Sequence, residues 1–143
     1  YYHDLSPMAQ GLVAAREKRG GPINVAVVGL GTGTLACQMK PGDQLTYYEI
    51  DPTVVQIAKD TRRFTFLSEC APDAKIVIGD ARLTLADSPD GQYDILIIDA
   101  FSSDAIPTHL LTKEAMAIFK DKIKPDGMIL MHISNKHMTL APV

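Results

Sequence analysis

The stretch Asn24–Gly33 has the sequence NVAVVGLGTG. Its first half, Asn24–Val28, is apolar, rich in β-branched residues and free of polar alternation, which is typical of a strand buried on both faces of a parallel sheet. Its second half is a glycine cluster, Gly29–Gly33, directly before a predicted short helix over Thr34–Met39. Glycines let a backbone turn tightly and approach a ligand, and a helix N-terminus offers unpaired N–H groups. We therefore favour a nucleotide-binding loop here over a plain strand-to-helix turn.

The rest of the chain repeats this alternation of strand and helix. The predicted strands are 45–50, 75–78, 95–98 and 128–133, and the predicted helices are 53–59, 81–86 and 112–123. Strand–helix alternation of this kind predicts an α/β fold, a Rossmann-like doubly wound parallel sheet. We expect Ile95–Ile98, the most apolar strand, to be central. We also expect a loop over 100–108 and a turn at Lys124–Gly127.

Composition limits the classes of protein to consider. The 143 residues suit a single domain, residues 1–143, large enough to bury a core. The net charge is −3 and no run of lysine or arginine is present, so nucleic acid is a disfavoured partner. The longest apolar stretches fall well short of the ~20 residues of a membrane span, and no signal peptide is visible.

The two cysteines, Cys37 in a predicted helix and Cys70 in a predicted loop, show neither a disulfide framework nor a metal-ligand spacing. We therefore expect a reducing compartment and a cytoplasmic domain. Because the chain ends without a closing helix or strand, we interpret it as a fragment of a longer protein. Its fusion to membrane segments outside this chain and its assembly as a homodimer stay open.

Acidic residues follow the predicted strands at the edge where a doubly wound sheet binds its ligand. Glu49 comes twenty positions after Gly29, and a carboxylate at about this spacing accepts the ribose hydroxyls of a nucleotide. The alternative for Glu49 is a solvated carboxylate at a strand end. Asp51 fits a helix cap better than a ligand group.

Two further strand ends carry acids. Asp80, in Gly79-Asp80-Ala81, suits an acceptor for an adenine amino group and equally an N-cap of the next helix. Asp99 follows Ile98, and Asp104 comes five positions later, so that two carboxylates lie near one crevice. Two acids beside an amine can orient it and remove a proton. Nicotinamide-dependent dehydrogenases do not require these acids, which argues against hydride transfer.

Taken together, these motifs resemble the spermidine synthase (aminopropyltransferase) family of the class I S-adenosylmethionine-dependent methyltransferase-like superfamily. The resemblance is strongest to the spermidine synthase-like domains fused to membrane segments in some bacterial proteins, and it extends over about Tyr2–Asn135. The residues that carry it are Gly29–Gly33, Glu49-Ile50-Asp51, Gly79-Asp80-Ala81, Tyr93–Asp99 and Ser102-Ser103-Asp104.

The resemblance implies transfer of an aminopropyl group from decarboxylated S-adenosylmethionine to a polyamine, with release of methylthioadenosine and without a metal. It also implies a methyltransferase-like domain that here lacks the last strands. Matched by position, the implied donor-binding residues are Gly29, Gly31, Thr32, Gly33, Glu49, Asp80 and Ala81. The implied catalytic residues are Asp99, as the base, and Asp104, beside the amine, with Tyr2 near the entrance.

Two departures from the family pattern widen the choice of function. Thr32 stands where the family has an aspartate that faces the donor's ammonium group, so ordinary S-adenosylmethionine becomes an admissible donor. Ala100 and Phe101 separate Asp99 from Ser102-Ser103-Asp104, which makes the position of Asp104 uncertain. A methyltransferase and a non-catalytic nucleoside-sensing module therefore stay open as alternatives. The histidines have no metal-ligand spacing, but His132 and His137 flank the end of the fifth predicted strand, where a role in the crevice stays open.

Overall fold

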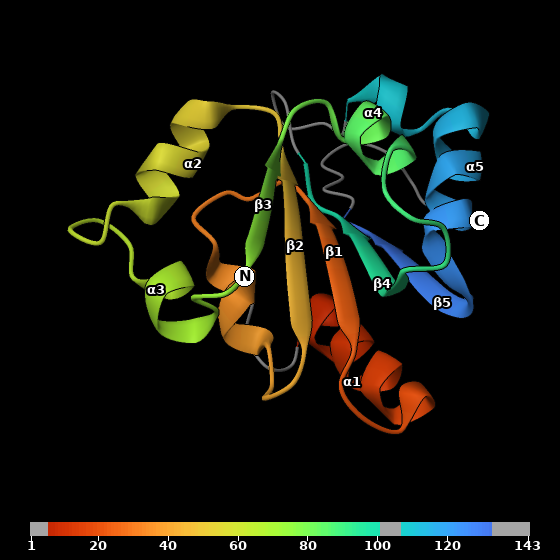
Figure 1. Ribbon diagram of the computed structural model, residues 1–143, viewed down its shortest axis with the longest axis horizontal. Helices are drawn as coiled ribbons and strands as arrows, with labels where there is room; N and C mark the ends of the chain where they lie inside the picture. Colours follow the sequence, from red (N-terminus) through yellow and green to blue (C-terminus); the bar gives the residue numbers. More distant parts are fainter. Residues whose placement is uncertain (1–5, 101–106, 133–143) are drawn as a thin grey trace.

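The computed structural model describes residues 6–100 and 107–132 (Figure 1). Helices and strands alternate along the chain from an N-terminal helix to a C-terminal strand. Their bounds are α1 Pro7–Arg19, β1 Asn24–Val28, η1 Thr34–Gln38, β2 Gln44–Glu49, α2 Pro52–Lys59, α3 Phe66–Cys70, β3 Lys75–Ile78, α4 Ala81–Ala86, β4 Tyr93–Ile98, η2 Thr108–Leu110, α5 Lys113–Lys122 and β5 Ile123–Met131. The two elements labelled η are 3₁₀ helices.

The strands form one parallel sheet in the order β3-β2-β1-β4-β5. Strand order reverses between β1 and β4, which places the topological switch point of the sheet at their carboxyl ends. The predicted Rossmann-like fold is confirmed. The prediction that the strand containing Ile95–Ile98 is central is wrong, because β1 holds the middle place. β4 lies between β1 and β5, and burial of all its residues explains its apolar sequence.

Helices cover both faces of the sheet (Figure 1). On one face, α1, α2 and α3 pack with η1 over alternate strand residues such as Val25 and Val27. On the other face, α4 and α5 pack over the intervening residues, such as Ala26 and Val28. Because neighbouring strand residues point to opposite faces, both cores need apolar side chains, and β1 is accordingly apolar without alternation.

Two helices, α1 and α3, were not predicted. α1 begins at Ser6, whose hydroxyl accepts a hydrogen bond from the amide of Ala9 at 3.2 Å, and it ends at Gly20 in the left-handed conformation. It buries a small apolar stripe that includes Leu12 against the sheet. α3 is a single short helix between two turns. Both helices are therefore stabilised mainly by tertiary packing, α1 on β4 and β5 and α3 on η1 and α2.

The predicted turn at Lys124–Gly127 is wrong, since this segment belongs to β5. The register is irregular there: Tyr93 pairs with Ile123, whereas Ile95 pairs with Met128. The ammonium group of Lys124 donates to both carboxylate oxygens of Asp94 at 2.8 Å, which holds the additional residues against β4. The turn signals of the sequence thus mark an irregularity within a strand.

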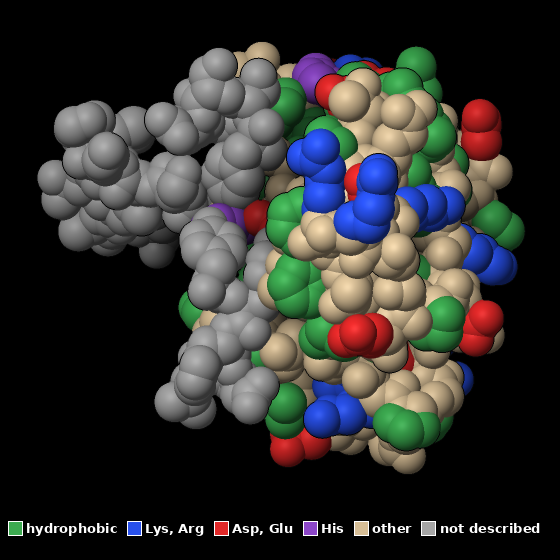
Figure 2. Space-filling model, turned by 90° about the vertical axis from the view of Figure 1, so that its left-hand side faces the viewer, with side chains coloured by type: hydrophobic (Ala, Val, Ile, Leu, Met, Phe, Trp, Pro, Cys, Tyr) green, Lys and Arg blue, Asp and Glu red, His purple; other side chains and the backbone are tan. Residues whose placement is uncertain are grey.

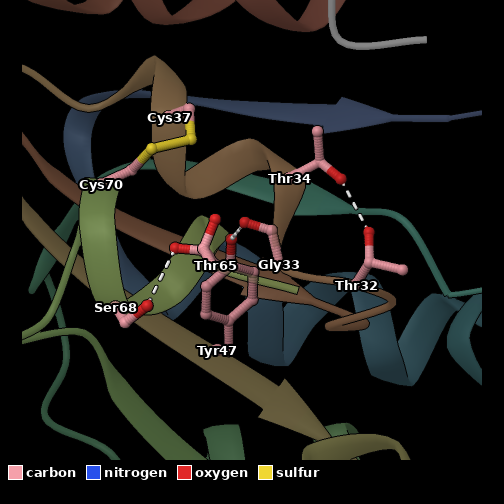
Figure 3. Close-up of a disulfide and its surroundings, with 8 residues drawn as sticks. All are labelled: Thr32, Gly33, Thr34, Cys37, Tyr47, Thr65, Ser68 and Cys70. Carbon is pink, nitrogen blue, oxygen red and sulfur yellow. Dashed lines mark hydrogen bonds between the residues drawn. A yellow bond between two sulfur atoms is a disulfide. The ribbon is translucent and has the colours of Figure 1, made fainter. Parts of the chain in front are cut away.

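The prediction that the cysteines do not pair is also wrong. Cys37 of η1 forms a disulfide with Cys70, and their Cα atoms are 4.7 Å apart (Figure 3). Cys70 is the last residue of α3 and not part of a loop. The bond joins two segments that the sequence separates by 33 positions. The cysteine count therefore no longer supports a reducing compartment.

The surface formed by α2 and α3 carries side chains of both signs. Figure 2 shows Asp and Glu side chains among the Lys and Arg side chains on this face. At the turn after α2, Arg62 and Arg63 both pair with Asp60. Among the helices within residues 6–100 and 107–132, none is long and apolar enough to cross a membrane.

Candidate active site

A cavity of about 610 Å³ opens at the carboxyl ends of β1, β2 and β4, at the switch point of the sheet. Its volume lies within the ~300–1,000 Å³ typical of small-molecule sites. Five of the predicted site residues line it together: Gly29, Gly31, Glu49, Ala81 and Asp99.

Thr32, Gly33 and Asp80 are not among the described residues that line the cavity. The hydroxyl of Thr32 lies 2.7 Å from that of Thr34 (Figure 3). Asp104, Tyr2 and His137 lie outside the residues that the structure describes, as do residues 101–106 of the predicted loop over 100–108.

Two glycines of the loop lie so close to neighbouring residues that a side chain would not fit there. Gly29 has a φ of 97°, and a Cβ at this position would lie 2.5 Å from the carbonyl oxygen of Asp99. Glycine therefore lets the ends of β1 and β4 approach each other. Gly33 has a φ of 82°, and a Cβ there would lie 2.9 Å from Cγ of Leu67 in α3. The loop thus packs directly against the helix that the disulfide holds.

Glu49, the last residue of β2, is buried, with 8% of its surface exposed. Its Oε2 accepts a hydrogen bond from the amide of Leu30 at 2.8 Å, and its Oε1 accepts one from the amide of Asp51 at 2.9 Å. The carboxylate therefore links the glycine loop to the beginning of α2. Each carboxylate oxygen has a second lone pair, so Glu49 keeps acceptor capacity for two ribose hydroxyls. The prediction for Glu49 did not include this structural role.

The two acids predicted to cap helices do so. Oδ1 of Asp51 accepts from the amide of Thr53 at 2.7 Å at the beginning of α2. Oδ1 of Asp80 accepts from the amide of Arg82 at 2.8 Å at the beginning of α4. Oδ2 of Asp80 lies 3.2 Å from Nε2 of His109, which lines the cavity. The capping role of Asp80 is confirmed, and its role toward adenine stays a prediction.

Asp99, the residue after β4, has an unusual environment for a carboxylate. Its side chain is 11% exposed, and burial raises the pKa of its carboxyl group to about 6. Its Oδ1 lies 2.6 Å from Nδ1 of His132, the residue after β5. Burial lowers the pKa of His132. A half-protonated carboxyl group near pH 6 suits proton transfer near neutral pH.

Sequence reasoning did not find the partners of Asp80 and Asp99, although a signal for one of them existed. Ile98 and Met131 are paired residues of parallel neighbours, so the residues that follow them, Asp99 and His132, come out at the same edge. No comparable signal linked His109 to Asp80. In residues 6–100 and 107–132, no group of three or more His, Cys, Asp or Glu side chains is arranged to hold a metal ion.

Residues 8–142 match the model of the spermine/spermidine synthase domain family. The chain belongs to this family. The chain is 31% identical over 114 residues to the polyamine aminopropyltransferase of Vibrio vulnificus. The match covers 76% of this chain and 37% of the Vibrio protein.

Two other similarities bear on the chemistry of the spermine/spermidine synthase domain. A spermidine synthase in complex with the transition-state analogue AdoDATO superimposes with a TM-score of 0.63 at 25% identity, covering 76% of this chain and 38% of that one. An N-terminal histidine N-methyltransferase of Emericella nidulans is 32% identical over 114 residues, covering 76% of this chain and 19% of that protein. The chain thus spans well under half the length of each of these proteins.

Proposed function

We propose that the cavity binds the nucleoside part of a sulfonium donor related to S-adenosylmethionine, and that the protein transfers the donor's aminopropyl group to an amine. The single observation that carries this proposal is the presence of buried Asp99 in the same cavity as Glu49. Glu49 supplies acceptors for a ribose, and Asp99 supplies a base at the neighbouring strand end. The family membership and the spermidine synthase complex with AdoDATO support the same assignment.

The proposed transfer needs one proton acceptor and no metal. An amine is protonated in water at neutral pH, so it must lose a proton before its nitrogen can act as a nucleophile. Asp99, whose pKa burial raises to about 6, is ionised at pH 7 and still basic enough to take that proton. The nitrogen lone pair then forms a bond to the carbon beside the sulfonium. The carbon–sulfur bond breaks, and its electron pair stays on sulfur in the thioether product.

Methyl transfer is the second candidate, and one residue favours it. Thr32 provides no negative charge in the glycine loop to select a donor that lacks a carboxylate. The same base and the same attack at a carbon beside sulfur would then move a methyl group. The similarity to a histidine N-methyltransferase supports keeping this alternative.

Turnover by the full protein tests the proposal. We expect methylthioadenosine to form from decarboxylated S-adenosylmethionine and putrescine, and Asp99→Asn to lower kcat by ~10²–10⁴ with little change in donor affinity. Formation of S-adenosylhomocysteine from ordinary donor would instead identify a methyltransferase. Donor binding with no product from either donor would identify a sensing module and contradict the proposal.

A further inference from the structure

Asp99 and His132 form a hydrogen-bonded pair at the edge of the sheet. Oδ1 of Asp99 and Nδ1 of His132 are 2.6 Å apart, and their side chains are 11% and 18% exposed. The backbone fixes both residues, because the amide of His132 donates to the carbonyl of Ile98 at 2.9 Å and the amide of Asp99 donates to that of Val28 at 2.8 Å. The two side chains therefore meet from the ends of adjacent strands without depending on a loop.

We propose that His132 is a positioning residue for Asp99, donating a hydrogen bond from Nδ1 that orients the carboxylate and keeps it ionised for proton transfer. This inference rests on the function proposed above for Asp99. It adds a residue, His132, that acts on the substrate only through Asp99.

The chemistry of the two groups determines which atom donates. An ionised carboxylate only accepts hydrogen bonds, so the proton of the pair lies on Nδ1 whenever Asp99 is ionised. Burial lowers the pKa of His132, which keeps the imidazole neutral near pH 7. A neutral Nδ1–H donor stabilises the carboxylate less than an imidazolium would, so it favours the ionised form of Asp99 without removing its basicity. Burial acts in the opposite direction by raising the pKa of Asp99 to about 6.

Each of the other titratable groups among the described lining residues has a partner of its own. Those among the described lining residues are Tyr48, Glu49, Asp51 and His109, in addition to Asp99. The Tyr48 hydroxyl lies 2.7 Å from that of Tyr93, and Glu49 accepts from two backbone amides. Asp51 caps α2, and His109 lies against Asp80. His132, which is not one of these described lining residues, lies within hydrogen-bond distance of the Asp99 carboxylate.

Three substitutions of His132 distinguish a role in positioning Asp99 from a role in packing alone. His132→Asn places an amide donor near the position of Nδ1 without a titrating ring. His132→Gln carries the same amide one methylene further, closer to the position of Nε2. His132→Phe keeps the ring volume and removes the donor.

The measurement is the pH profile of kcat of the full protein, together with a ¹³C NMR titration of the Asp99 carboxyl group, assigned with Asp99→Asn. In the wild type we expect the acidic limb of kcat and the carboxyl titration near pH 6. His132→Phe and His132→Gln should move both upward by about one pH unit or more, because the ionised form loses a charge-assisted hydrogen bond. At pH 7 a shift of this size should lower their kcat roughly twofold or more, with unchanged KM for the donor, and His132→Asn should restore most of it.

Two results would overturn the inference. One is a carboxyl titration that stays in place in folded His132→Phe or His132→Gln protein. The other is a loss in His132→Asn as large as in His132→Phe. If the wild type transfers nothing from either donor, the function proposed above fails, and the NMR titration alone then decides whether His132 controls the ionisation of Asp99.

Discussion

At the scale of single residues, burial of Asp99 has a consequence for stability as well as for proton transfer. The pKa of this carboxyl group is about 6 in the folded protein, against an ordinary value of 3.8. At a pH between 3.8 and about 6, Asp99 is ionised in the unfolded chain, whereas in the folded protein it keeps its proton. Stability is therefore lost as the pH rises through this range, and the full penalty applies above about pH 6.

Asp99→Asn removes that penalty, so the variant should be more stable than the wild type at pH 8 and equally stable below pH 3.5. A shift of about two units corresponds to at most ~3 kcal/mol. Urea denaturation at both pH values measures the difference, with Asp121→Asn as a control at an exposed position. A variant that is no more stable than the wild type at pH 8 would mean that burial of the carboxylate is fully compensated.

Thr32 leads to a prediction about the donor. A carboxylate at this loop position would attract the donor's ammonium group and repel its carboxylate, whereas threonine does neither. Two unit charges ~4 Å apart interact by about 4 kcal/mol at an effective dielectric of 20, and a quarter of that is roughly a fivefold preference.

We therefore expect the wild type to bind S-adenosylmethionine and its decarboxylated form with similar affinity, and Thr32→Asp to shift the preference toward the decarboxylated donor. The ratio of the two dissociation constants at fixed salt is the readout, with Thr32→Asn as the neutral control. A hundredfold preference in the wild type would contradict this prediction.

The sequence was enough to predict several residues of the candidate site, but not the hydrogen bonds that those residues form. Gly29, Glu49 and Asp99 could be found because each lies at the carboxyl end of a buried strand, and these ends converge at one edge of a parallel sheet. The hydrogen bonds from Leu30 to Glu49 and from His132 to Asp99 depend on side-chain direction and on register, which the sequence does not encode locally.

At the scale of helices and strands, elements with strong local sequence signals were predicted, whereas those that depend on tertiary packing were not. β3 and α4 begin and end where predicted, because each is a local pattern bounded by strong turn and capping residues. α1 and α3 were not predicted, because their stability comes largely from packing on other elements, α1 on β4 and β5 and α3 on η1. The Cys37–Cys70 bond escaped it for a related reason: only the packing of α3 on η1 brings the sulfur atoms together.

That disulfide should contribute substantially to stability. It closes a loop over a sequence separation of 33 residues, and the chain-entropy model assigns such a loop roughly 3–4 kcal/mol. Cys37→Ser should lower the free energy of unfolding by about this amount, and a thiol reductant should do the same to the wild type, because Cys37 is exposed. The reductant should not affect Cys37→Ser. Identical urea midpoints for oxidised and reduced wild type would contradict this prediction.

At the scale of the whole molecule, a parallel sheet gathers its functional groups at one edge. The two cores fix the sheet from both sides, and the reversal of strand order between β1 and β4 opens the cavity there. The disulfide holds α3 against η1, next to the glycine loop, while the opposite face bears α4 and α5. The fold thus explains why acids far apart in sequence can serve one ligand.

The central claim is that this cavity binds a nucleoside through Glu49, and calorimetric titration with methylthioadenosine tests it most directly. Glu49→Gln keeps the size of the side chain and removes its charge, so it should weaken binding about tenfold or more, because two ribose hydroxyls lose a charged acceptor. Glu69→Gln, at an exposed position on α3, is the matched control and should bind like the wild type. Equal affinity of wild type and folded Glu49→Gln would contradict the account.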